Sequence, residues 1–256
     1  MFDFKTVDAQ VVCRLASDMD KNGYAVLPNA LSPEDLQSAR HYINDQASLR
    51  DNEYFAVHGI EAMEDSLFGS LGASPAFRQL LAELYEIVTG EAPAIDERIF
   101  PVIRCLEGQT GLKESHFYHF DATAVTALAP VVIPVEGEHC GDLIMFPNIR
   151  NIRSSAIYNI VEKAILHNSM SKKICAFGVR RGWLHPIRIK LVPGNLYLFW
   201  GYRSLHCNDQ CDPTMRRATG LYHFGNPHRE SILARKFLGS NKRKAKLDEN
   251  GLRPVV

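Results

Sequence analysis

The sequence has no excess of charge of either sign, because 29 lysines and arginines are balanced by 29 aspartates and glutamates. A neutral chain lacks the basic surface that general binding of nucleic acid or of an anionic membrane requires. It also lacks an apolar run long enough to span a bilayer, since residues such as Asp142 and Pro193 interrupt the best candidates. These absences predict a protein with no nucleic-acid partner and no transmembrane segment.

Paired cysteines are missing as well. The cysteines are scattered and none forms a Cys-x-x-Cys pair: Cys13, Cys105, Cys140, Cys175, Cys207 and Cys211. Such spacing is more typical of reduced thiols than of a disulfide framework. The polar and partly acidic start, MFDFKTVDAQ, is unlike a signal peptide. The sequence therefore predicts a cytoplasmic globular protein.

The chain does contain enough apolar residues for a full core. With 256 residues, 46% of them hydrophobic, it fits one domain. We expect a single domain over 1–256, made of a mainly helical front, a β-rich core with an insertion, and a basic tail: residues 1–95, 96–227 with the insertion 147–186, and 231–256.

Apolar spacing and capping residues predict three helices in the front part, at about 5–21, 33–43 and 75–88. The acidic, glycine-containing stretch 50–72 shows no periodicity and predicts irregular structure. Another amphipathic helix is expected at 154–166, within the insertion.

From Arg98 onward the pattern changes to short β-rich runs separated by glycine, proline and asparagine. Expected strands are 99–106, the stretch around His119, 142–146, 187–192, 195–200 and 218–224. Short strands at such intervals are typical of a jelly roll of the cupin kind. The predicted fold class is therefore α+β, with a double-stranded β-helix core.

The triplet His119-Phe120-Asp121 is the strongest candidate for chemistry. Side chains two apart in extended backbone project from the same face, so an imidazole and a carboxylate can reach one ion together. One more imidazole would complete the two-His-one-carboxylate triad of non-haem Fe(II) oxygenases. A His-x-Asp triplet alone has a high false-positive risk, and its bland interpretation is a hydrogen-bonded strand pair.

A later segment supplies what the triplet lacks. The stretch PGNLYLFWGYRSLHCN presents His206 after a buried strand, and Arg216 and Arg217 open the next strand. An arginine holds a carboxylate through two parallel hydrogen bonds and stays charged when buried. Either arginine could bind the far carboxylate of 2-oxoglutarate. We favour Arg217, because Thr219 lies on the same strand face and could bond the same carboxylate.

Zinc is an alternative use of Cys207 and Cys211, which lie near His206 and His223. It is disfavoured because structural zinc sites need four ligands in compact pairs. His116 is an alternative ligand, but its odd spacing from His119 places it on the opposite strand face.

Three segments together resemble the phytanoyl-CoA dioxygenase-like family of Fe(II)/2-oxoglutarate oxygenases. They are the entry GYAVLPNALSPEDLQSAR, the His-x-Asp triplet, and the closing segment in which Arg217 follows His206 by eleven residues. The resemblance implies a double-stranded β-helix that consumes 2-oxoglutarate and O2 and releases succinate and CO2. It also implies Fe(II) ligation by His119, Asp121 and His206, and 2-oxoglutarate binding by Arg217. Halogenases of this class replace the carboxylate ligand with a small residue, so Asp121 favours hydroxylation or another oxidation.

The chain departs from the family pattern after residue 140, where CGDLIMFPNIRN replaces the usual glycine-led strand and an insertion follows. Residues 142–190 contain nine basic and only two acidic residues. This excess has two interpretations: a solvated face, or an insertion that covers the site and attracts an anionic substrate. On the second interpretation the candidate substrate contacts are His116, Arg180, Arg181 and Trp183.

The sequence thus predicts an Fe(II)- and 2-oxoglutarate-dependent hydroxylase of a small, anionic molecule such as a thioester, a phosphorylated metabolite or an acidic sugar. The alternative is a cupin-like metal-dependent isomerase or a β-helix that binds a ligand without catalysis. The arginine discriminates between them, because such a protein needs no carboxylate clamp beside the metal.

Overall fold

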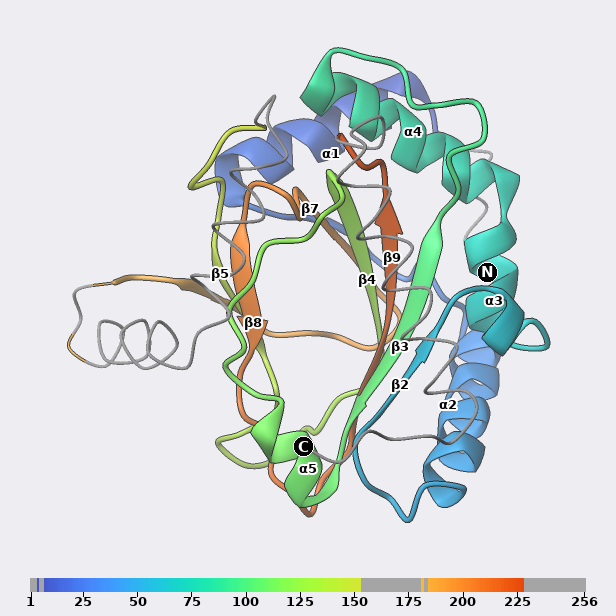
Figure 1. The fold of residues 1–256 in the computed structure, drawn as a ribbon, viewed down its shortest axis with the longest axis vertical. Helices are drawn as coiled ribbons and strands as arrows, with labels where there is room; N and C mark the ends of the chain where they lie inside the picture. Colours follow the sequence, from blue (N-terminus) through green and yellow to red (C-terminus); the bar gives the residue numbers. More distant parts are fainter. Residues whose placement is uncertain (1–3, 5–6, 153–180, 182–183, 228–256) are drawn as a thin grey trace, which may run out of the picture.

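Two antiparallel sheets form the centre of the computed structural model, which describes residues 4, 7–152, 181 and 184–227 (Figure 1). The larger sheet has the strand order β1-β7-β4-β9-β3-β2, and the smaller has the order β6-β5-β8. The strands are β1 (Ala25–Leu27), β2 (Phe55–His58), β3 (Phe100–Leu106), β4 (Val125–Val132), β5 (Leu143–Phe146), β6 (Ile187–Ile189), β7 (Leu196–Phe199), β8 (Leu205–Asn208) and β9 (Arg217–Phe224). The predicted α+β class with a double-stranded β-helix core is confirmed.

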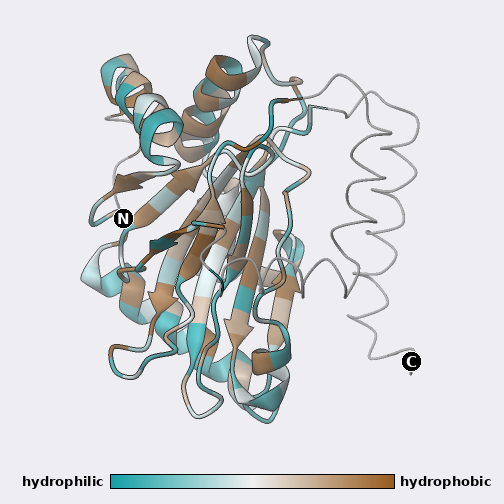
Figure 2. Cartoon of the chain, turned by 90° about the vertical axis from the view of Figure 1, so that its left-hand side faces the viewer, coloured by the Kyte–Doolittle hydropathy of each residue, from teal (hydrophilic) through white to brown (hydrophobic). Residues whose placement is uncertain are grey.

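Apolar side chains of both sheets pack together between them. This cluster contains Leu128, Tyr197 and Phe199 from the larger sheet, with Leu143, Met145 and Ile189 from the smaller. Hydrophobic and hydrophilic positions alternate along the strands, as expected when neighbouring side chains point to opposite faces (Figure 2). Buried polar residues of the two sheets and of the segment before β4 include Asp121, His206 and Arg217, so the fold buries the candidate site.

Helices cover the outer face of the larger sheet (Figure 1). They are α1 (Ala9–Asn22), α2 (Pro33–Ser48), α3 (Leu67–Ala73) and α4 (Pro75–Thr89), while the short α5 (Gly108–Lys113) follows β3. Local chemistry sets their ends. Ser32 and Asp35 form a reciprocal capping box at the start of α2, and Gly23 ends α1 in the left-handed conformation at φ 87°.

The prediction of irregular structure over 50–72 is wrong. This stretch contains β2, the short 3-10 helix η2 (Glu61–Met63) and the start of α3. Strand β2 is only four residues long and lies at the edge of the sheet, so its alternation is too short to detect. Helix α3 includes Gly69, a poor helix former, which is required because a Cβ there would collide with the Met63 carbonyl.

Other predicted boundaries shift by a few residues. Helix α1 begins at Ala9 because the side chain of Asp8 accepts a hydrogen bond from the Val11 amide. Helix α2 continues five residues past the predicted end, whereas β6 stops at Ile189. The expected helix at 154–166 and the basic tail lie outside the described residues. Within the described part of the chain, no helix is both long and apolar enough to cross a membrane.

Candidate metal and co-substrate site

His119 and Asp121 precede β4 on a segment that pairs briefly with β8. His119 forms an isolated bridge with His206: each amide donates to the other residue's carbonyl, at 2.9 and 3.0 Å. The Asp121 amide donates to the carbonyl of Gly201 at 3.0 Å. The triplet therefore lies outside the regular strand that was expected to carry it. The backbone hydrogen bonds to His206 and Gly201 keep the triplet extended instead.

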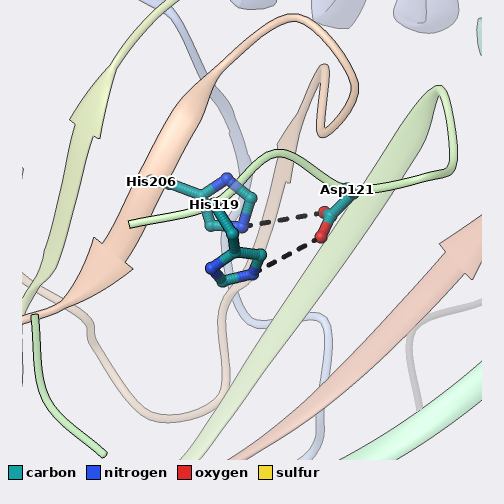
Figure 3. Close-up of side chains that lie close together, drawn as sticks. All are labelled: His119, Asp121 and His206. Carbon is teal, nitrogen blue, oxygen red and sulfur yellow. Dashed lines mark ion pairs between the residues drawn. The ribbon is translucent and has the colours of Figure 1, made fainter. Parts of the chain in front are cut away.

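The three side chains converge on one point (Figure 3). The Nε2 atom of His119 lies 3.6 Å from Oδ1 of Asp121, and Nε2 of His206 lies 3.7 Å from Oδ2 of the same carboxylate. All three ligand atoms lie within 4.8 Å of one another. Among the described residues, this is the group of histidine, cysteine and acidic side chains that could hold a metal ion.

The second nitrogen of each imidazole is already engaged. Nδ1 of His119 lies 2.8 Å from the carbonyl oxygen of Phe117, and Nδ1 of His206 lies 3.0 Å from that of Ser204. A carbonyl can only accept, so each Nδ1 carries the proton and donates. This tautomer leaves both Nε2 lone pairs directed at the shared point. Backbone acceptors of this kind are the usual outer partners of metal-binding histidines.

The electrostatics favour a neutral His119 imidazole beside an ionised Asp121 carboxylate. Burial, followed by the neighbouring His206, lowers the pKa of His119 to about 3. Burial alone would raise the pKa of Asp121, but three nearby imidazoles and a hydroxyl donor outweigh it and lower that pKa well below its usual range. At neutral pH His119 therefore offers a neutral nitrogen and Asp121 a negative oxygen, the forms in which these residues bind a metal.

Three residues that the sequence analysis missed support Asp121. The hydroxyl of Thr126 donates to Oδ2 at 2.5 Å, and Nδ1 of His223 lies 3.4 Å from that hydroxyl and 3.7 Å from Oδ2. A Cβ on Gly201 would collide with both Asp121 and Thr126, so only glycine fits there. No motif marks these residues, because Thr126 and His223 meet only through the register of β4 and β9.

Arg217 is the second feature of the site. It is 1% exposed at the start of β9, and its Nε donates to the carbonyl of Gly141 at 2.8 Å. Its Nη1 donates to the hydroxyl of Thr219 at 3.3 Å. Its Nη2 is buried and has no hydrogen-bond partner among the described residues. Burial, together with the nearby Arg104, lowers the pKa of Arg217 to about 10, which still leaves it charged at neutral pH. A buried donor of this kind fits a carboxylate ligand.

Arg216 points the other way. Its guanidinium forms two hydrogen bonds to the carboxylate of Glu107, at 2.6 and 3.0 Å, and also bonds Asn44 and Asn52. The hydrogen-bond donors of the Arg216 guanidinium are therefore used by other protein groups. Of the two arginines considered for 2-oxoglutarate, only Arg217 has a buried nitrogen without a partner among the described residues.

A cavity of about 290 Å³ opens beside the triad. Its lining combines two of the three converging side chains with aromatic and charged groups: Arg104, Glu114, Phe117, His119, Phe120, Asp121 and Ala122. Arg104 was not among the candidates from sequence. It comes from β3 and lies opposite Thr219 of β9, a relation that only the strand register creates.

The candidate substrate contacts lie apart from this lining or outside the described residues. His116, in the left-handed conformation at φ 56°, lies 3.3 Å from Asp209 Oδ1, so it is turned toward the loop after β8. Arg181 is exposed. Arg180 and Trp183 lie outside the described residues.

Two basic residues of the segment 142–190 are engaged with other protein groups. Arg150 stacks on the rings of Phe120 and Tyr202, at 3.8 and 4.1 Å from their centroids. Arg188 forms ion pairs with Asp209 and Asp142. In the described part of the chain, these two basic side chains are therefore engaged by protein groups, which neither interpretation of the charge excess predicted.

The comparisons with known proteins concern the fold. No protein-family model matches the chain, and no curated protein matches it either. Among solved structures, a prolyl hydroxylase from Trichoplax adhaerens, in complex with a hypoxia-inducible factor peptide, aligns over 90% of this chain and 99% of its own. Its TM-score is 0.54 at 12% identity.

Two further structures extend the likeness. The non-haem α-ketoglutarate-dependent carbocyclase SnoK of nogalamycin biosynthesis aligns over 91% of this chain and 92% of its own, with a TM-score of 0.53 and 16% identity. A prolyl 4-hydroxylase from Phytophthora capsici gives a TM-score of 0.57 at 10% identity, over 91% of this chain and 68% of its own. The chain has the fold of these 2-oxoglutarate oxygenases. At such identities the likeness establishes the fold, and the activity must be argued from the chain's own residues.

Proposed function

We propose that this protein is an Fe(II)- and 2-oxoglutarate-dependent oxygenase, of the phytanoyl-CoA dioxygenase-like branch, that hydroxylates a small anionic molecule. One observation carries the proposal. Two imidazole nitrogens and a carboxylate converge inside a β-helix whose other end holds Arg217, a buried guanidinium with one nitrogen unpartnered among the described residues. The triad alone would fit several metal proteins; the arginine adds a site for a dicarboxylate.

The residues fit both groups. His119, Asp121 and His206 would hold Fe(II) through two nitrogens and one oxygen, the donor set that leaves positions open for co-substrate and oxygen. Bound Fe(II) supplies the oxidative decarboxylation of 2-oxoglutarate by O2, which gives succinate and CO2 and drives oxidation of the substrate.

The protein's own groups position the reactants. Arg217 would bind the far carboxylate of 2-oxoglutarate through its free Nη2, while Thr219 and Gly141 fix the guanidinium plane. Thr126 donates to one oxygen of Asp121 and so orients the carboxylate. The apolar cluster between the sheets, whose Phe199 packs edge-on against His206, would shield one side of the site from water. These are orienting and shielding roles, which is the protein's share in cofactor chemistry.

The direct test is release of succinate from 2-oxoglutarate by the full-length protein with added Fe(II) under air. We expect succinate above the rate of metal and buffer alone, and a further increase when the correct substrate is supplied. No succinate with or without candidate substrates would instead favour the cupin-like isomerase or the ligand-binding protein. A metal-dependent shift in melting temperature without turnover would point to binding alone.

Arg104 supports an anionic substrate. Its Nη2 donates to a Glu114 carboxylate oxygen at 3.2 Å, but its Nε is buried and without a partner among the described residues. Its side chain lines the cavity next to His119. An anionic group in this cavity would therefore lie near a guanidinium whose Nε can still donate a hydrogen bond.

A test of Arg104 first needs a substrate. Carboxylated and phosphorylated metabolites are screened for the one that most increases succinate release. Arg104→Gln should raise the KM for that compound about tenfold, the cost of losing a hydrogen bond to a charged group. Arg104→Lys should restore part of it, and the effect should shrink at high salt. Arg14→Gln, an exposed arginine on α1, is the matched control. Equal KM values in Arg104→Gln and Arg14→Gln would rule out this role.

A further inference from the structure

Cys140 and Cys211 lie directly opposite each other, where the pairing of β5 with β8 continues past the ends of both strands. Backbone hydrogen bonds flank the pair on both sides, donated by the amides of Gly141 and Asp212 at 2.8 and 3.0 Å. An antiparallel pair flanked in this way is not itself hydrogen-bonded, and its Cα atoms lie about 4.5 Å apart. Disulfides span Cα separations of roughly 4.4–6.8 Å, so the backbone already has a suitable spacing.

Both residues are free thiols, and they differ in access. Cys140 is partly exposed, whereas Cys211 is 2% exposed, and burial raises the pKa of the Cys211 thiol to about 11. Each sulfur donates to a backbone carbonyl of its own segment: Cys140 to Gly137 at 3.5 Å and Cys211 to Met215 at 3.8 Å. Side-chain rotation, with the loss of only weak hydrogen bonds, therefore turns the two sulfurs toward each other.

We propose that peroxide oxidises Cys140 and Cys211 to a reversible disulfide, and that this disulfide weakens the binding of 2-oxoglutarate by Arg217. The sulfur of Cys140 attacks the peroxide, so that an S–O bond forms, the O–O bond breaks and one water leaves. The Cys211 thiol, giving up its proton, then attacks the resulting sulfenic acid. The S–S bond forms, the S–O bond breaks and a second water leaves. A dithiol reductant reverses the change.

Gly141 connects this pair to Arg217. It follows Cys140 directly, has φ 74°, and its carbonyl accepts the Nε hydrogen bond of Arg217 at 2.8 Å. A Cβ at this position would collide with Cδ of Arg217, so the backbone packs tightly on the arginine side chain. Facing Cβ atoms in such a pair are about 4.5 Å or more apart, and a disulfide closes them to about 3.8 Å. Closing that gap draws the Cys140 segment, with the Gly141 carbonyl, away from its present position. This coupling rests on the proposed function, whereas the disulfide itself does not.

The experiment oxidises the metal-free full-length protein with hydrogen peroxide, removes the peroxide, alkylates remaining thiols and maps the peptides. We expect a Cys140–Cys211 disulfide that dithiothreitol reverses and that Cys140→Ser cannot form. Cys13→Ser, which removes an exposed cysteine elsewhere, should form it normally. After Fe(II) is added, the oxidised wild-type protein should show a KM for 2-oxoglutarate raised roughly tenfold, as for a weakened hydrogen bond to a charged group.

Two results would overturn the proposal at different steps. Alkylation of both cysteines after peroxide treatment, or a disulfide between other cysteines, would show that Cys140 and Cys211 do not form the proposed disulfide. A Cys140–Cys211 disulfide with an unchanged KM in an active enzyme removes the coupling to Arg217. An enzyme that never releases succinate contradicts the proposed function instead, and the peptide map still decides whether the disulfide forms.

Discussion

Asp121→Ala is expected to abolish Fe(II)-dependent turnover of 2-oxoglutarate, with a loss of more than about a hundredfold. Losing an outer-shell partner of a metal ligand already costs 10- to 100-fold, and Asp121 is the carboxylate on which both Nε2 atoms converge. Succinate release measures the loss. The melting temperature with and without Fe(II) under anaerobic conditions measures binding, since a ligand of the folded state alone stabilises it.

Two matched variants make this result specific. Thr126→Val keeps the Asp121 carboxylate but removes the hydroxyl that donates to Oδ2, so we expect an intermediate loss of about tenfold. Asp212→Ala removes a carboxylate that accepts hydrogen bonds from the amide and hydroxyl of Thr214 in the loop after β8, and should retain wild-type turnover. Asp121→Ala with full iron-induced stabilisation and undiminished turnover would show that the metal does not bind at this triad.

Short-range pattern made the core of the site predictable. The period of two places His119 beside Asp121 and puts Arg217 and Thr219 on one face of β9, whereas Arg216 directly precedes the strand and points away. The jelly roll followed from the spacing of short apolar runs. The pairings of His119 with Asp121 and of Arg217 with Thr219 needed only residues close together in the sequence.

The parts that sequence reasoning missed depend on register between distant strands. Thr126 meets His223 because β4 pairs with β9, and Arg104 faces Thr219 because β3 pairs with β9. Gly201 is required by two side chains that reach it from the other side of the site. Edge strand β2 was missed because four residues at the margin of a sheet carry too little alternation. Nothing local in the sequence specifies these contacts.

Arg217→Met should raise the KM for 2-oxoglutarate about a hundredfold while changing kcat little at saturation. Truncating one partner of a buried, hydrogen-bonded charge pair costs several kcal/mol, and about 2.7 kcal/mol corresponds to that factor. Methionine fills similar space and leaves no buried charge, so the variant should fold at least as stably as the wild type. Arg217→Lys should lie between the two, because an ammonium keeps the charge but not the bidentate geometry.

Arg216→Met is the decisive control, because it removes the neighbouring arginine, which lies directly before β9. It breaks the paired hydrogen bonds to Glu107 and should lower the melting temperature, but it should leave the KM for 2-oxoglutarate near the wild-type value. The two variants therefore separate a structural ion pair from a ligand clamp. Swapped results, with Arg216→Met raising the KM and Arg217→Met leaving it unchanged, would place the co-substrate carboxylate on the outer face of β9. That outcome would contradict a site built inside the barrel.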